Sequence, residues 1–91
     1  MIVKILNYGD ADNRKFIEYG VLGLTSEQRE FLNDNLEEET CIVENEFKLR
    51  MYFPDDLYPF QSDAAKYRLD DFIAREEIEM AVFLSSFLED M

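Results

Sequence analysis

The sequence EFKLRMYF, residues 46–53, alternates between apolar and other side chains without a break. This alternation predicts a strand with one buried face, because successive side chains point to opposite sides of a sheet. Residues 40–43, TCIV, form a second run that is typical of a strand, and Glu44 and Asn45 lie between the two runs. We favour a hairpin for residues 40–53, although a two-residue turn without glycine is unusual, and one long strand is the alternative.

Two further apolar runs lie upstream of this segment. Residues 2–8 and 15–23 are rich in β-branched and aromatic side chains, and the sequence GDADNR between them favours a turn, so the pair predicts another hairpin. Gly20 inside the later run predicts a bulge or a close packing contact. A short helix should follow, because Thr25 and Gln28 have the spacing of a capping box.

The last third of the chain predicts a helix. Residues 62–91 contain neither glycine nor proline, and Ser62 is a suitable N-cap. An apolar stripe begins in this segment, and an ideal helix that continued it would place Glu76 among apolar neighbours. We therefore expect a kink or a split of the helix near residues 74–77.

The second half of this helix is apolar on more than one side. Its core face continues through a regularly spaced set, namely Met80, Phe83, Leu84, Phe87 and Met91. Ile78 and Val82 lie off that face. A helix that is apolar on most sides is either deeply buried or in contact with another chain. We therefore take Ile78 and Val82 as candidates for an oligomer seam or a partner groove.

Together these elements predict one α+β domain over residues 1–91. We expect an antiparallel sheet of three to four strands with two helices packed on one face, in the order β-β-α-β-(β)-α. The apolar fraction of 47 % is sufficient for a core in a chain of 91 residues. The side chains that we expect to be buried are Val3, Ile5, Phe31, Phe47, Leu49, Met51, Leu69, Phe72, Leu84 and Phe87.

The formal net charge is −12, and it is concentrated in two blocks. Residues 30–46 carry seven acidic and no basic residues, and residues 69–91 carry seven acidic residues and one arginine. This charge disfavours direct binding to DNA, RNA or an anionic membrane, because phosphate contact needs lysine and arginine. It favours a basic protein partner. The carboxylates that we expect to contact this partner are Glu37, Glu38, Glu39, Asp70, Asp71, Glu76, Glu77 and Glu79.

The sequence contains no motif for catalysis or metal binding. It has no histidine, which excludes Ser–His and Cys–His pairs and histidine-containing zinc sites. Cys41 is the single cysteine, and the three glycines form no phosphate-binding loop. We therefore expect no enzymatic activity, no cofactor and no metal. The single cysteine and the lack of a signal-like or membrane-spanning apolar run lead us to expect a cytoplasmic protein.

In size, charge and lack of motifs the chain resembles the small acidic inhibitors of phages and mobile elements, the nucleic-acid mimics of anti-CRISPR and anti-restriction type. The resemblance is one of composition over the whole chain. It implies an inhibitor that occupies the basic groove of a nucleic-acid-handling enzyme, in the host cytoplasm if a phage encodes it. The alternatives are an antitoxin or immunity protein that neutralises a basic toxin, and a homodimerising structural module whose acidity serves solubility.

Overall fold

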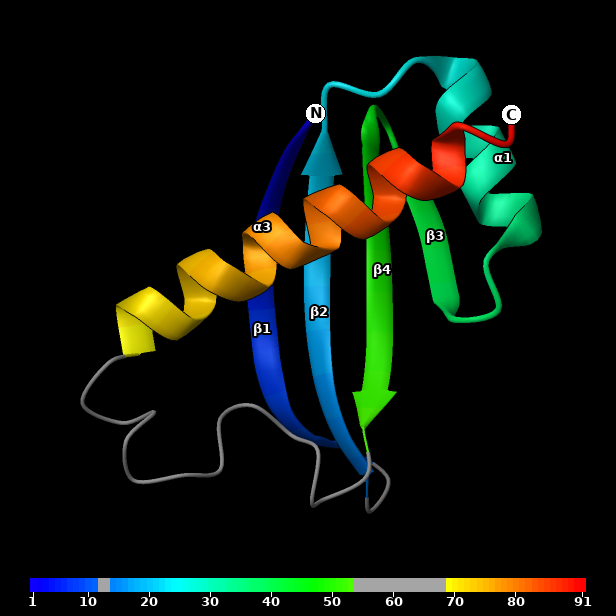
Figure 1. Cartoon of the computed structure of the whole chain (residues 1–91). Helices are drawn as coiled ribbons and strands as arrows, with labels where there is room; N and C mark the ends of the chain where they lie inside the picture. Colours follow the sequence, from blue (N-terminus) through cyan, green and yellow to red (C-terminus); the bar gives the residue numbers. More distant parts are fainter. Residues whose placement is uncertain (12–13, 54–68) are drawn as a thin grey trace.

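Over the residues that the structure describes, the fold is a four-stranded antiparallel sheet with two helices on one side (Figure 1). The computed structural model describes residues 1–11, 14–53 and 69–91. In chain order the elements are β1 (Ile2–Ala11), β2 (Arg14–Leu22), α1 (Ser26–Asn35), β3 (Glu39–Val43), β4 (Glu46–Phe53) and α3 (Leu69–Leu88). The strand order is β1-β2-β4-β3, so the two hairpins meet through β2 and β4. The predicted α+β architecture is confirmed.

The first hairpin contains a bulge and a close contact at Gly20. The register of β1 against β2 shifts between Ile5 and Asn7, which leaves Leu6 as an extra residue in β1. A Cβ atom at Gly20 would lie 3.0 Å from Leu6 Cδ1 and 2.6 Å from Glu46 Oε1. The close contact expected at Gly20 is therefore confirmed, and the bulge lies in the neighbouring strand.

β3 and β4 form the favoured hairpin around a two-residue turn. Val43 pairs with Glu46, and Glu44 and Asn45 connect them. Glu44 has a φ of 57°, the one positive φ of a non-glycine residue in the described part of the chain. A positive φ at the first turn position matches the twist of the flanking strands, and glycine usually supplies it. A glutamate in this conformation costs the fold roughly 1–2 kcal/mol.

α1 begins as the sequence predicts. The Gln28 amide donates to Thr25 Oγ1 at 3.1 Å, and the Thr25 amide donates to Gln28 Oε1 at 2.9 Å. This capping box satisfies two amides that the helix itself cannot pair. The helix ends at Asn35, where the Leu36 amide donates to the Leu32 carbonyl at 3.0 Å. Leu32 is fully buried and anchors this short helix to the core.

α3 runs as one uninterrupted helix across the sheet (Figure 1). The kink or split expected near residues 74–77 is therefore replaced by a continuous helix. That expectation rested on the cost of bringing Glu76 towards the core. The structure keeps Glu76 half-buried at the margin of the core, and the neighbouring Glu77 accepts a hydrogen bond from the backbone of β1. The predicted N-cap at Ser62 lies outside the described residues.

The core lies between the sheet and the helices. The side chains at its centre, each at most 1 % exposed, are Ile17, Tyr19, Val21, Phe47 and Leu49 of the strands together with Leu32 and Leu84 of the helices. Four predicted core residues are buried, namely Val3, Phe47, Leu49 and Leu84. Four others are half-buried and pack against the core, namely Ile5, Phe31, Met51 and Phe87. The side chains of Leu69 and Phe72 lie outside the description.

Replacing Glu44 with glycine should stabilise the protein by about 0.5–1 kcal/mol, because glycine adopts a positive φ without steric cost. Thermal and urea unfolding measure the change. The matched control is Asn45→Gly, at the turn position without a positive φ, which should be neutral or destabilising. If Glu44→Gly is no more stable than the wild type, the cost assigned to this turn is wrong.

Candidate partner-binding surface

Negative charge is concentrated on the helical side of the molecule. The four strands and the 44–45 turn carry five acidic and five basic residues. Residues 26–38 and 69–91, which we call the helical layer, carry twelve acidic and two basic residues, a net charge of −10. Most of both acidic blocks therefore falls in one layer, whereas the sheet is neutral.

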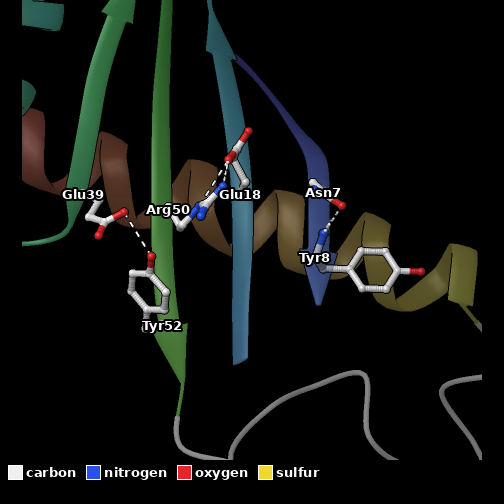
Figure 2. Close-up of polar contacts among 6 residues, drawn as sticks. All are labelled: Asn7, Tyr8, Glu18, Glu39, Arg50 and Tyr52. Atoms are coloured by element: carbon white, nitrogen blue, oxygen red, sulfur yellow. Dashed lines mark hydrogen bonds and ion pairs between the residues drawn. The ribbon is translucent and has the colours of Figure 1, made fainter. Parts of the chain in front are cut away.

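The sheet face opposite the helices carries charges of both signs, and Arg50 and Glu18 form an ion pair on it (Figure 2). Arg50 Nη2 lies 2.7 Å from Glu18 Oε2, and the Arg50 guanidinium lies 4.4 Å from the centre of the Phe16 ring. The Tyr52 hydroxyl donates to Glu39 Oε2 at 3.1 Å. Hydrogen bonds to Glu18 and Tyr52 raise the pKa of Arg50. This face therefore presents little net charge to a partner.

Two of the carboxylates predicted on α3 are fully accessible. Asp71 and Glu79 are exposed, and the step of eight residues from one to the other corresponds to about 12 Å along the helix axis. Glu76 and Glu77 are half-buried, and both interact with groups of the protein itself. The side chain of Asp70 lies outside the description. Among the predicted carboxylates whose side chains the structure describes on α3, Asp71 and Glu79 are therefore the exposed ones.

Glu77 closes part of the outer edge of β1. Its Oε2 accepts a hydrogen bond of 2.7 Å from the Ile5 amide. Another amide of β1, that of Tyr8, donates to Asn7 Oδ1 at 2.9 Å (Figure 2). β1 is an edge strand, and unpaired amides at a sheet edge are open to pairing with other chains. Glu77 therefore has a structural role that its sequence position does not reveal.

Glu76 lies half-buried beside Tyr19 and Glu79. Burial raises the pKa of the Glu76 carboxyl, the negative charge of Glu79 raises it further, and Arg75 partly offsets both effects. Burial also raises the pKa of the Tyr19 phenol well above its usual range, and the charges of Glu76 and Glu79 add to this effect. Ionised Glu76 therefore costs the folded state free energy.

The three consecutive glutamates 37–39 do not form one patch. Glu37 and Glu38 line a hollow of about 230 Å³ with Phe83 and Phe87 of α3. Glu39 begins β3 and binds Tyr52 on the other side of the sheet. The boundary between the loop and β3 therefore assigns Glu37 and Glu38 to the helical layer and Glu39 to the sheet.

Exposed apolar side chains interrupt the acidic surface of α3. Ile78 is 65 % exposed and Val82 is 61 % exposed, as expected for residues off the core face. Phe83 and Met91, which we assigned to the core face, are 40 % and 54 % exposed. Phe83 is the contact candidate that the sequence analysis missed. Its position at the margin of the stripe that contains Met80 and Leu84 was the available signal.

The described residues contain no feature of a metal site. Residues 1–11, 14–53 and 69–91 include no group of three or more metal-ligating side chains that could hold an ion. Over the same residues, neither helix has the length and apolar character needed to cross a membrane. Cys41 is exposed and free. What the described surface offers is charge and apolar area, the two properties through which macromolecules bind one another.

Glu77→Ala should destabilise the protein by about 1–2 kcal/mol, because it leaves the Ile5 amide without its charged acceptor. Urea unfolding measures the loss, and amide hydrogen exchange at Ile5 should become faster. Glu79→Ala is the control on the same helix and should change stability by less than about 0.5 kcal/mol. Unchanged exchange at Ile5 in Glu77→Ala would show that the hydrogen bond contributes nothing.

Glu76→Gln should raise the melting temperature by roughly 2 °C at pH 7 and leave it nearly unchanged at pH 4. The pKa of Glu76 is higher in the folded than in the unfolded state, so folding loses stability as pH rises from the ordinary glutamate pKa through the raised one. The Glu76→Gln variant has no carboxyl to ionise, so it does not lose this stability as pH rises. Solvent screening keeps the gain in melting temperature small. The control Glu89→Gln removes the same charge from an exposed position. Equal gains at both pH values would refute the burial effect.

The similarity to known proteins extends over nearly the whole chain. The model of a family of unknown function, DUF5750, matches residues 2–90. Among curated proteins, none matches the chain. The chain therefore belongs to the DUF5750 family.

Proposed function

We propose that this protein is an acidic inhibitor that binds, through its helical layer, the basic groove of a nucleic-acid-handling enzyme. The observation that carries the proposal is the separation of charge, with a net −10 on the helical layer and a neutral sheet. Charge that served solubility alone would not need to be gathered on one side. An asymmetric field of this kind steers a basic partner towards one face of the molecule.

The accessible groups of the helical layer suit such a groove. Asp71 and Glu79 are exposed on a continuous helix, and Glu37 and Glu38 adjoin its C-terminal half through a hollow. Lysine and arginine side chains that contact phosphates bind carboxylates through the same charge-assisted hydrogen bonds. The exposed Phe83 beside this hollow adds apolar contact. Charge would then govern the rate of encounter, and apolar contact the lifetime of the complex.

Competition with nucleic acid is the direct test. Tagged protein is used to purify its partner from a host lysate at low salt, and the purified partner is loaded with a fluorescently labelled DNA or RNA duplex. Added protein should displace the duplex, as measured by fluorescence anisotropy. Its affinity for the partner should fall at least about tenfold between roughly 50 and 300 mM salt. A partner that keeps its duplex while bound to the protein would contradict the proposal.

Charge reversals locate the binding face. Asp71→Lys and Glu79→Lys each change the net charge by two units, and each should weaken binding by about tenfold. Glu39→Lys makes the same change at an exposed position on the opposite face of the sheet and should weaken it by about twofold or less. Thermal melts verify that all three variants are folded. Equal losses for the three variants would show that only net charge matters, and would remove the helical layer as the binding site.

A further inference from the structure

The outward face of α3 and the turn that follows it carry a stripe of exposed residues in heptad spacing. In alternating steps of four and three, these residues are Asp71, Arg75, Ile78, Val82, Ser85 and Glu89. We call them the outer stripe. Apolar side chains at this spacing are the pattern through which two helices pack along each other, and the two apolar members of the outer stripe are Ile78 and Val82. The two members at its centre, Ile78 and Val82, are 65 % and 61 % exposed.

The orientation of α3 holds the outer stripe away from the core. Met80 and Leu84 are buried beneath the helix, at 5 % and 0 % exposure. Glu77 is held against β1 by its hydrogen bond to Ile5. Rotating α3 to bury Val82 would withdraw Leu84 from the core, at a cost of several kcal/mol. The apolar centre of the outer stripe can therefore be covered only from outside.

We propose that a second copy of this chain covers the outer stripe, with the two α3 helices antiparallel and Val82 on the two-fold axis. Arg75 and Glu89 each lie seven residues from Val82. The antiparallel register therefore sets Arg75 of one copy opposite Glu89 of the other, twice. Ile78 meets the small side chain of Ser86, which lets the helices approach closely. The pairs of Arg75 with Glu89 are thus complementary in charge, and the pairs of Ile78 with Ser86 are complementary in size.

The positions beside the outer stripe fit the same register. Ala81 of one copy lies level with Phe83 of the other, and Ala74 lies level with Asp90. Glu79 faces Ser85 of the other copy, whose hydroxyl can donate a hydrogen bond to it. Across this seam, no carboxylate of the stripe or of these flanking positions meets another carboxylate. The acidity of the chain is therefore compatible with pairing along this one helix.

A parallel pair is disfavoured by the same charges. It would set Arg75 against Arg75 and Glu89 against Glu89, and like charges at facing positions of paired helices select against that partner. The antiparallel arrangement removes both conflicts. It is also an isologous contact, in which the same patch is used by both copies, so that assembly stops at a dimer.

The dependence on salt concentration distinguishes this dimer from the proposed binding to a basic partner. Each copy carries a net charge of −12, so screening of the overall repulsion should strengthen self-association. Binding of a basic partner should weaken with salt instead. One helix pair buries less than the roughly 1,200–2,000 Å² of a stable interface, so we expect a dissociation constant on the order of 10–100 µM. The dimer seam and the partner-binding surface share Asp71 and Glu79, so a second copy and a basic partner compete for α3, and their opposite salt dependence distinguishes the two proposals.

Sedimentation velocity of the full chain across this concentration range tests the dimer at low and high salt. Val82→Glu places two carboxylates on the axis and should weaken self-association at least tenfold. The matched control is Val43→Glu, which makes the same change at a 50 % exposed position on β3 and should have less than a twofold effect. A wild type that stays monomeric at both salt concentrations, or a dimer that Val82→Glu leaves intact, overturns the proposal.

A charge swap tests the register. Arg75→Glu alone and Glu89→Arg alone should each weaken the dimer about threefold to tenfold. The double variant Arg75→Glu/Glu89→Arg should restore wild-type affinity, because each copy then presents the opposite charges at the same two positions. Thermal melts monitored by circular dichroism verify that the variants are folded. A double variant no stronger than the single variants overturns the antiparallel pairing.

Discussion

The antiparallel pairing of β2 with β4 is the interaction on which the rest of the structure depends. Each hairpin is local in sequence, and this contact joins them through seven residue pairs between Lys15–Val21 and Phe47–Phe53. The register brings Tyr19 beside Leu49 and Val21 beside Phe47 on one face. That face is the apolar face of the sheet against which α3 packs. A slip of β4 by one residue against β2 would turn the core side chains of β4 towards solvent. The register and the core therefore specify each other.

The elements with local signals were predictable from sequence. The alternation in residues 46–53 identified β4, and the Thr25–Gln28 spacing identified the start of α1. The course of α3 was not predictable, because the group that engages Glu77 is the amide of Ile5, 72 residues away. The apolar periodicity of a helix considers each side chain only relative to its own helix. It cannot include a hydrogen-bond partner on a distant strand. The turn at Glu44 was ambiguous for a related reason, since it carries a positive φ without glycine.

The candidate surface was predictable in amount of charge but not in its location. The composition gives the net charge of −12, whereas the topology decides on which side of the sheet each carboxylate lies. Glu38 and Glu39 are neighbours in sequence, yet one borders α3 and the other binds Tyr52 on the far face. The fold also leaves Glu76 and Glu77 half-buried and not freely accessible. Glu77 stabilises the folded state through its hydrogen bond to Ile5, whereas ionised Glu76 destabilises it. The resulting molecule has one acidic layer with exposed apolar side chains on α3 and one sheet whose charges balance.

The hydrogen bond between Ile5 and Glu77 links the first strand to the last helix, and this link has a consequence for the order of events during synthesis. All four strands leave the ribosome before α3 does, so a nascent sheet has both an uncovered apolar face and an open β1 edge. Such intermediates aggregate readily. Arrival of α3 covers the face and occupies the edge in one step. The acidic side chains that precede it along the chain would keep neighbouring nascent chains apart until then.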